Sequence, residues 1–163
     1  MKTAWAPWRM EYILGGDKKT DCIFCPGNDR SMDEERLILY IDTSTMVIMN
    51  RYPYINGHLL VAPVKHVRDL EGLNEEEMLS LLKMVRSAST ILKLHMNPEG
   101  FNIGMNIGKV AGAGVEAHMH FHIVPRWNGD TNYMTVLADV RVIPEHIRET
   151  YRKLLPLFSE LRG

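Results

Sequence analysis

The sequence predicts an α+β fold with a mainly antiparallel sheet, one long helix and a C-terminal helix. Two observations carry this prediction: short apolar runs separated by turn residues, and one long stretch that keeps a helical period. The length of 163 residues, with 45% hydrophobic and 24% charged residues, is typical of one globular domain. We therefore expect a single domain over 1–163, with an irregular segment at 1–36 and a C-terminal helical extension at 140–163.

The strands follow from apolar runs that end in turn residues. Asp42 begins a turn between two such runs, and Pro53 and Gly57 mark a loop before the next one. A run that is apolar throughout predicts a buried strand, whereas alternation predicts a strand with two different faces. The strands are expected at 37–40, 46–49, 58–64, 101–107, from His118 onward, and at 133–137.

Two helices are expected. Asn74 suits the N-cap of the first, with glutamates at 75–77 in its first turn. The second covers 147–158, and Pro156 is expected to break or kink it. The apolar residues that keep the period of the first helix to about His95 are Met78, Leu81, Leu82, Val85, Ala88, Ile91 and Leu92.

Three of the seven histidines stand at alternate positions, at His118, His120 and His122. Side chains alternate between faces in a strand, so the three imidazoles would line one surface while Met119 and Phe121 point into a core. Such a row suits a phosphorylated substrate better than it suits a core. A metal site is the alternative, because a His-x-His strand can place two imidazoles on one zinc ion.

A glycine-rich loop at 108–115 leads directly into the histidines. Gly108, Gly112 and Gly114 permit positive φ and close backbone approach, so successive amides could cup an anion. An ordinary long hairpin loop is the alternative. The position immediately before three aligned histidines favours a phosphate cradle.

The two cysteines, Cys22 and Cys25, form a Cys-x-x-Cys turn. A structural disulfide is disfavoured in a reducing compartment, so the pair offers two thiolates to one metal or acts as a redox pair. A metal site would need two more ligands, for which the downstream histidines are candidates.

The formal net charge of −1 gives no global basic field, so we expect neither nucleic acid nor a membrane surface as a partner. No apolar run approaches the roughly 18–20 residues of a membrane span. The N-terminal residues lack the apolar stretch of a signal peptide. We expect a cytoplasmic protein that binds phosphate locally.

The motifs together resemble those of a known family. The histidine stretch resembles the His-φ-His-φ-His-φ-φ signature of the histidine triad (HIT) superfamily, and the resemblance covers most of the chain. One further part of the sequence is similar to the family's second conserved segment, and others are similar to the branch that contains bacterial diadenosine tetraphosphate phosphorylases. The residues concerned are His118-Met119-His120-Phe121-His122-Ile123-Val124 for the signature, Asn50-Arg51-Tyr52-Pro53 with Gly57-His58-Leu59-Leu60-Val61 for the second segment, and Trp5, Pro7, Arg9, Met10, Tyr12 and 124–132 for the branch.

The resemblance implies a nucleotidyl-histidine mechanism. His120 would attack the α-phosphorus of a nucleotide. A neutral imidazole is nucleophilic, and an ordinary pKa near 6.5 makes that state abundant at neutral pH. His122 would donate to charge developing at the bridging oxygen, and His58 would close over the phosphate. Water or orthophosphate would resolve the intermediate.

The resemblance also implies contacts with the nucleotide. Asn50 would bind the ribose, with a strand-end cap as the alternative. Phosphate oxygens would be held by Asn106 and by the amides of Gly112, Gly114 and Val115. Family members commonly carry Ser or Thr a few residues before the triad, but 112–115 contain no hydroxyl, so only backbone amides could donate there. The candidates for packing against the base are Ile23, Phe24 and Ile48, although Phe24 could equally be plain core.

Zinc-bearing relatives use a Cys-x-x-Cys pair, a His after the Gly-His strand and the first triad His. The matching positions are Cys22, Cys25, His66 and His118, a Cys₂His₂ set that closes a tetrahedral structural site. Such a site would tie the irregular N-terminal segment to the sheet. A metal-free thiol pair is the alternative.

The resemblance implies a hydrolase or transferase that acts on dinucleoside polyphosphates, with diadenosine tetraphosphate first, as a homodimer without an organic cofactor. Phosphorolysis would release ADP and ATP, whereas hydrolysis would release AMP or ADP. The alternatives are a nucleoside phosphoramidase, a non-catalytic nucleotide-binding regulator and a zinc-stabilised interaction module.

Overall fold

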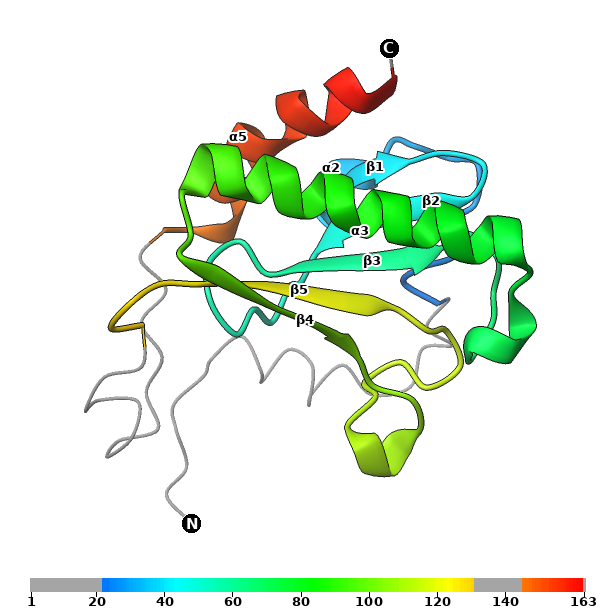
Figure 1. Ribbon diagram of the computed structural model, residues 1–163. Helices are drawn as coiled ribbons and strands as arrows, with labels where there is room; N and C mark the ends of the chain where they lie inside the picture. Colours follow the sequence, from blue (N-terminus) through cyan, green and yellow to red (C-terminus); the bar gives the residue numbers. More distant parts are fainter. Residues whose placement is uncertain (1–21, 131–144, 163) are drawn as a thin grey trace, which may run out of the picture.

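The computed structural model describes residues 22–130 and 145–162, which form a five-stranded sheet in the order β1-β2-β3-β5-β4 (Figure 1). Every neighbouring pair of strands is antiparallel, so the predicted α+β class with a mainly antiparallel sheet is confirmed. The strands are β1 (Ile38–Ile41), β2 (Thr45–Met49), β3 (Leu59–Pro63), β4 (Gly100–Met105) and β5 (Phe121–Arg126).

Two helices pack on one side of this sheet (Figure 1). The long α3 (Glu75–Met96) contacts β2, β3 and β5, and the C-terminal α5 (Ile147–Ser159) contacts β1. None of the helices in 22–130 and 145–162 is long and apolar enough to cross a membrane. The shorter helical turns are α2 (Asp33–Arg36), η1 (Leu70–Gly72), η2 (Lys109–Ala111) and η3 (Glu160–Arg162).

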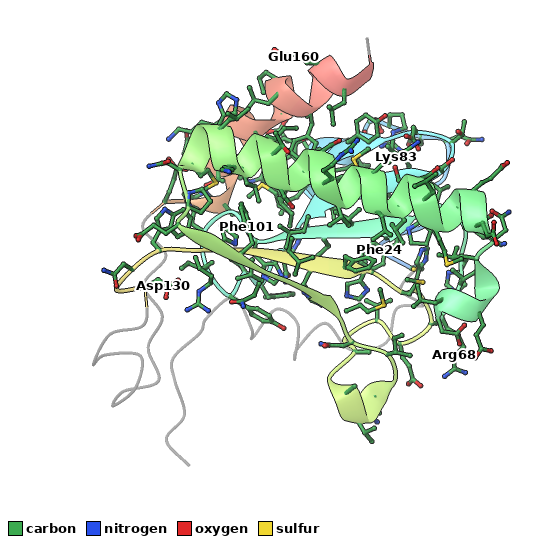
Figure 2. The ribbon with its side chains drawn as sticks, in the orientation of Figure 1. Phe24, Arg68, Lys83, Phe101, Asp130 and Glu160 are labelled. Carbon is green, nitrogen blue, oxygen red and sulfur yellow. The ribbon has the colours of Figure 1, made fainter. Side chains whose placement is uncertain are left out.

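The two faces of the sheet pack against different parts of the chain. Val47 and Leu59 belong to the larger core cluster, together with residues of α3 and α5. Ile48 and Leu60, the next residues along the same strands, belong to a smaller cluster with Phe24. The second face is therefore covered by the N-terminal segment around Phe24, as Figure 2 shows for that side chain.

The predicted start of the long helix is confirmed. The Asn74 side chain accepts from the Glu77 N–H, while the Glu77 carboxylate accepts from the Asn74 N–H, which makes a complete capping box. Asn97, with φ of 48°, ends the helix. Leu82 was predicted to face the core but is 54% exposed, because it lies at the border of the apolar stripe.

The strand predicted to start at His118 begins only at Phe121. Extended towards residue 119, the β3–β5 register would bring Met119 opposite Pro63, which has no N–H to donate. The Met119 N–H donates instead to the Val67 carbonyl, at 2.7 Å. The predicted division of faces holds, because Met119 and Phe121 both pack against the larger core cluster.

The C-terminal helix runs through Pro156 and ends at Ser159, so Pro156 does not break it, and the alternative of a kink stays a prediction. The expected strand at 133–137 and the start of the expected extension, 140–144, lie outside the described residues.

Candidate functional site

The histidines meet on the sheet face opposite α3. His122 pairs directly with Leu60 of β3, and directly opposed residues share a face. The ring centroid of His122 lies 4.9 Å from that of His120 and 5.2 Å from that of His58, the residue directly before β3. The predicted grouping of His58, His120 and His122 is thus present in the structure.

The proton of His120 is placed by a backbone contact. Its Nδ1 lies 3.0 Å from the carbonyl oxygen of His118, which can only accept. A neutral His120 must therefore carry its proton on Nδ1, and Nε2 keeps a lone pair. This is the tautomer that a nucleophilic imidazole needs.

A chain of hydrogen bonds places the protons of His58 and His122. The Tyr54 N–H donates to Nδ1 of His58 at 3.1 Å, so the His58 proton is on Nε2. That Nε2 lies 3.0 Å from Nδ1 of His122 and donates to it. A neutral His122 must then carry its own proton on Nε2, which makes this atom a donor. His120 and His122 thus hold opposite tautomers, one with a free lone pair and one with a free proton.

Burial keeps these two imidazoles neutral. Burial lowers the pKa of His120, although the bond to the His118 carbonyl acts in the other direction. Burial, together with the proximity of His120, lowers the pKa of His122 to about 4. Desolvation disfavours the imidazolium form, so both tautomers are well defined at neutral pH.

An aromatic ring supports the His120 side chain from the interior. Phe24 is fully buried and stacks on His120 with centroids 4.7 Å apart at 30°. Ile48 is 4% exposed in the same cluster, whereas Ile23 is 50% exposed. Phe24 therefore acts first as a support for the imidazole, and a base contact by these three residues stays a prediction.

Asn50 lies beside His58. Its Oδ1 accepts from the Tyr52 N–H at 3.0 Å, which turns its Nδ2 towards Nδ1 of His58 at 3.3 Å. The structure thus shows Asn50 as a partner of His58, and the ribose contact stays a prediction.

The glycine-rich loop folds around η2. Gly108 and Gly112 have φ of 83° and 88°, as expected for positions that only glycine adopts readily, while Gly114 is not among the positive-φ residues. Asn106 Nδ2 donates to the Gly112 carbonyl at 3.3 Å and braces the loop. Val115 packs against the smaller cluster beside Phe24. Phosphate binding by Asn106, Gly112, Gly114 and Val115 stays a prediction.

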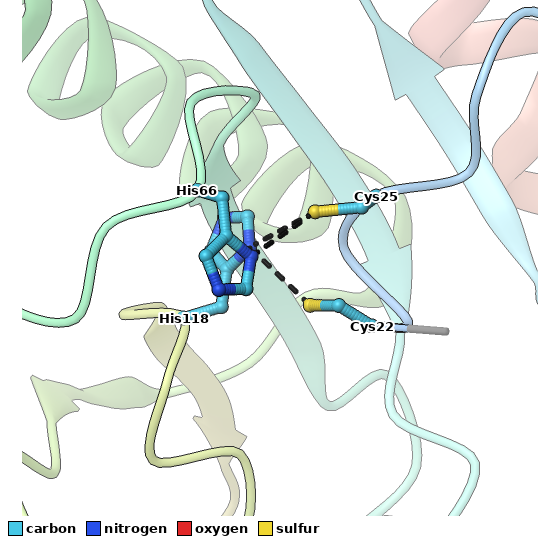
Figure 3. Close-up of side chains that lie close together, drawn as sticks. All are labelled: Cys22, Cys25, His66 and His118. Atoms are coloured by element: carbon cyan, nitrogen blue, oxygen red, sulfur yellow. Dashed lines mark hydrogen bonds between the residues drawn. The ribbon is translucent and has the colours of Figure 1, made fainter. Parts of the chain in front are cut away.

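The four side chains predicted as metal ligands converge (Figure 3). Cys22 Sγ lies 3.3 Å from Nδ1 of His118, and Cys25 Sγ lies 3.3 Å from Nδ1 of His66. The two Nδ1 atoms are 3.2 Å apart. Zn–N bonds of about 2.0–2.1 Å and Zn–S bonds of about 2.3 Å place tetrahedral ligand atoms roughly 3.3–3.8 Å apart, so the donor set fits zinc.

The surroundings prepare His118 for that role. Its Nε2 donates to the Pro63 carbonyl at 2.8 Å, which leaves a lone pair on Nδ1, the atom that faces the thiols. An outer hydrogen bond of this kind commonly orients a metal-binding histidine. Burial lowers the pKa of His118, which favours the neutral form that a ligand needs.

Two residues of the site were missed from the sequence. Tyr54 contacts both His58 and His122 with its ring, and Pro63 fixes the tautomer of His118. Tyr54 stands in an irregular loop with no periodic signal, and Pro63 acts through its carbonyl, which every residue has. Only the closeness of both to the Gly57-His58 strand start could have pointed to them.

Comparison with known proteins identifies the family of the chain. Residues 32–129 match the model of the HIT domain. A Mycobacterium tuberculosis protein named AP-4-A phosphorylase is 34% identical over 94% of this chain and 83% of its own length. A Dictyostelium discoideum protein named bis(5'-adenosyl)-triphosphatase is 30% identical over 76% of this chain and 86% of its own.

A solved structure of a histidine triad protein has a similar fold. A Zn-bound histidine triad family protein from Mycobacterium smegmatis superposes with a TM-score of 0.66 at 26% identity, covering 89% of this chain and 98% of its own. The family model spans more than half of the chain and includes the histidine row. The chain therefore belongs to the HIT family.

Proposed function

We propose that the protein is a nucleotidyl hydrolase or transferase that acts on dinucleoside polyphosphates such as diadenosine tetraphosphate. One observation carries the proposal: a lone pair on His120 Nε2 stands beside a proton on His122 Nε2 in neighbouring rings. Two relatives whose names specify AP-4-A phosphorylase and bis(5'-adenosyl)-triphosphatase support the substrate class.

In the proposed reaction, Nε2 of His120 bonds to the α-phosphorus while the bond from that phosphorus to the bridging oxygen breaks. The Nε2–H of His122 donates a hydrogen bond to the departing oxygen, where charge develops, and the phosphate group leaves as an anion without taking the proton of the neutral imidazole. With diadenosine tetraphosphate, ATP leaves and an adenylyl group stays on His120. Attack by orthophosphate then gives ADP, and attack by water gives AMP.

The remaining contacts belong to the same proposal. Asn50 would bind ribose, and Asn106 with the amides of Gly112, Gly114 and Val115 would hold phosphate oxygens. His58 orients His122 through the hydrogen bond between their rings. Phe24 and Ile48 would pack near the base at the inner end of the site.

The test incubates the protein with diadenosine tetraphosphate, with and without orthophosphate, and resolves the products. We expect ATP in both cases, ADP only with phosphate, and a labelled protein after an alkaline denaturing quench with α-³²P substrate, since the P–N bond of the intermediate is hydrolysed in acid. His120→Asn should lose label and turnover by at least about 10³-fold, since it removes the nucleophile. His95→Asn, an exposed histidine on α3, is the matched control.

Other outcomes separate the alternatives. Full turnover by His120→Asn would refute the nucleophile. Turnover of adenosine 5′-phosphoramidate alone would mark a nucleoside phosphoramidase, and binding of AMP without any turnover would mark a nucleotide-binding regulator.

We also propose a structural zinc ion on Cys22, Cys25, His66 and His118. The spacing of the ligand atoms and the prepared tautomer of His118 support it, as does the Zn-bound relative. When bound, zinc supplies a cross-link that ties residues 22–25 to the sheet, and four protein ligands leave it no open position for catalysis.

A homodimer, a cytoplasmic location and one domain over 1–163 belong to the same proposal. Strand β4 is an edge of the sheet, and its Asn102, Ile103 and Gly104 are exposed, which leaves an edge that a second copy could pair with. A solution mass of one 18.7 kDa chain would contradict the dimer.

A further inference from the structure

Tyr54 is an exposed aromatic residue at the edge of the site. Its side chain is 48% exposed, and neither core cluster includes it. Its ring lies 4.5 Å from that of His58 and 5.9 Å from that of His122, in the second case nearly parallel at 8°. One part of the ring is thus against the histidines, and the other part faces solvent.

Tyr54 belongs to a row of rings that runs from the interior towards the surface. Phe24, fully buried, stacks on His120; His120 neighbours His122; and His122 neighbours Tyr54. The nucleophile therefore lies on the inner side of the row and the hydrogen-bond donor, His122, on the outer side. A leaving group that accepts a hydrogen bond from His122 would therefore lie nearer to Tyr54 than to Phe24.

The backbone around Tyr54 is held in place from several directions. Its N–H donates to His58, and the Tyr52 N–H donates to Asn50. At the far end of the loop, Thr150 of α5 is 2% exposed, and its hydroxyl lies 2.9 Å from Asn56 Oδ1, where it can donate. A ring presented on a braced loop loses little conformational freedom when it binds.

We propose that Tyr54 is a specificity-determining residue whose exposed ring stacks on the base of the leaving nucleotide. This inference rests on the proposed function and deepens it: the protein discriminates in favour of substrates that carry a second base beyond the phosphate chain. Base–aromatic stacking is worth about 1–3 kcal/mol per base, which corresponds to roughly 5- to 140-fold in affinity.

The test compares two ligands with the same phosphate chain, diadenosine tetraphosphate and adenosine 5′-tetraphosphate, which lacks the second nucleoside. Both are titrated into the His120→Asn protein by calorimetry, so that neither is consumed. We expect Tyr54→Leu in that background to weaken the binding of diadenosine tetraphosphate about 5- to 140-fold, with the affinity for adenosine 5′-tetraphosphate changed less than about twofold. Tyr54→Phe, which keeps the ring, should bind both as before.

The remaining outcomes overturn the inference. Equal loss for the two ligands means that Tyr54 only positions His58, and no loss for either means that the ring is not used. Loss in Tyr54→Phe as large as in Tyr54→Leu assigns the effect to the hydroxyl instead of to stacking.

Failure of the proposed function looks different. It shows as absent turnover and absent label in the protein with His120 and Tyr54 both intact. The binding comparison tests the role of Tyr54 whatever the result of the turnover assay, because binding requires no catalytic step.

Discussion

At the scale of the residue, the site depends on where three imidazoles carry their protons. The carbonyl of His118 places one proton on Nδ1 of His120, and His58 places the other on Nε2 of His122. The carbonyl of Pro63 leaves Nδ1 of His118 free for a metal. Similar side chains in one short segment thus acquire three different chemical roles from their hydrogen-bond partners.

The low pKa of His122 predicts a pH dependence. Burial and His120 hold it at about 4, below the ordinary value of 6.5, so unfolding takes up a proton between these two values. The free energy of unfolding should therefore fall as the pH drops from about 6.5 to about 4, and the contribution is fully present above 6.5. Urea midpoints at pH 7, 5.5 and 4.5 measure it.

The matched variant is His122→Asn. It should show a shallower loss of stability over the same pH interval, because the group that titrates is gone. Equal slopes in the two proteins would mean that His122 does not titrate with a lowered pKa.

At the scale of the element, the connection between β2 and β3 positions the site. Gly57, directly before His58, has φ of 77°, and an added Cβ would meet Met96 Sδ at 2.7 Å and Pro125 Cγ at 3.3 Å. Gly27 has a similar φ of 71° but nothing within 4 Å. The two glycines separate the cost of backbone strain from the cost of a clash.

Gly57→Ala should destabilise the protein by about 1–2 kcal/mol, since a shift of the flexible end of Met96 adds to roughly 1 kcal/mol of backbone strain. It should also reduce kcat, because the displaced backbone carries His58. Gly27→Ala should cost only about 1 kcal/mol and leave kcat unchanged. Chemical denaturation and steady-state kinetics on both variants measure this, and equal losses would contradict it.

The sequence predicted the helices and strands well wherever the apolar residues of a segment follow a single periodicity. Asn74 and Glu77 predicted the start of α3. The alternation of Met119 with the neighbouring histidines correctly predicted which side chains lie on the core face of the sheet. The start of β5 was wrong, because it depends on Pro63, a residue of the partner strand that offers no N–H. Strand pairing is a property of two segments, which the pattern of one segment cannot reveal.

For the site, the sequence predicted which residues take part, but not which side chains and backbone groups contact one another. Cys22, Cys25, His66 and His118 could be grouped only through resemblance to a family, and the structure brings them together. The contact of Tyr54 with His58 depends on the path of an irregular loop, which no periodicity describes.

At the scale of the whole molecule, the proposed zinc site joins segments that lie far apart in the sequence. Cys22 and Cys25 stand at the start of the described residues, whereas His66 follows β3 and His118 precedes β5. Burial, with Cys22 alongside, raises the pKa of Cys25 to about 11, so the metal-free thiol stays protonated at neutral pH. Zinc binding must release that proton, and the apparent zinc affinity should therefore rise with pH.

The purified protein should contain about one zinc per chain. Cys25→Ser should lose most of it and melt roughly 4–8 °C lower, which corresponds to at least about 2 kcal/mol for a chain of this size. Elemental analysis and thermal unfolding measure this, with His95→Asn as the control. Unchanged zinc content in Cys25→Ser would remove the assignment.

The position of His118 has a consequence for folding kinetics. Its ring faces Cys22, 96 residues earlier in the chain, while its carbonyl holds the ring of His120. Contacts between such distant residues close large loops, which costs chain entropy and slows folding. One residue thus couples the closure of a 96-residue loop through its ring to the orientation of the nucleophile through its carbonyl, so a change that displaces the backbone at His118 disturbs both.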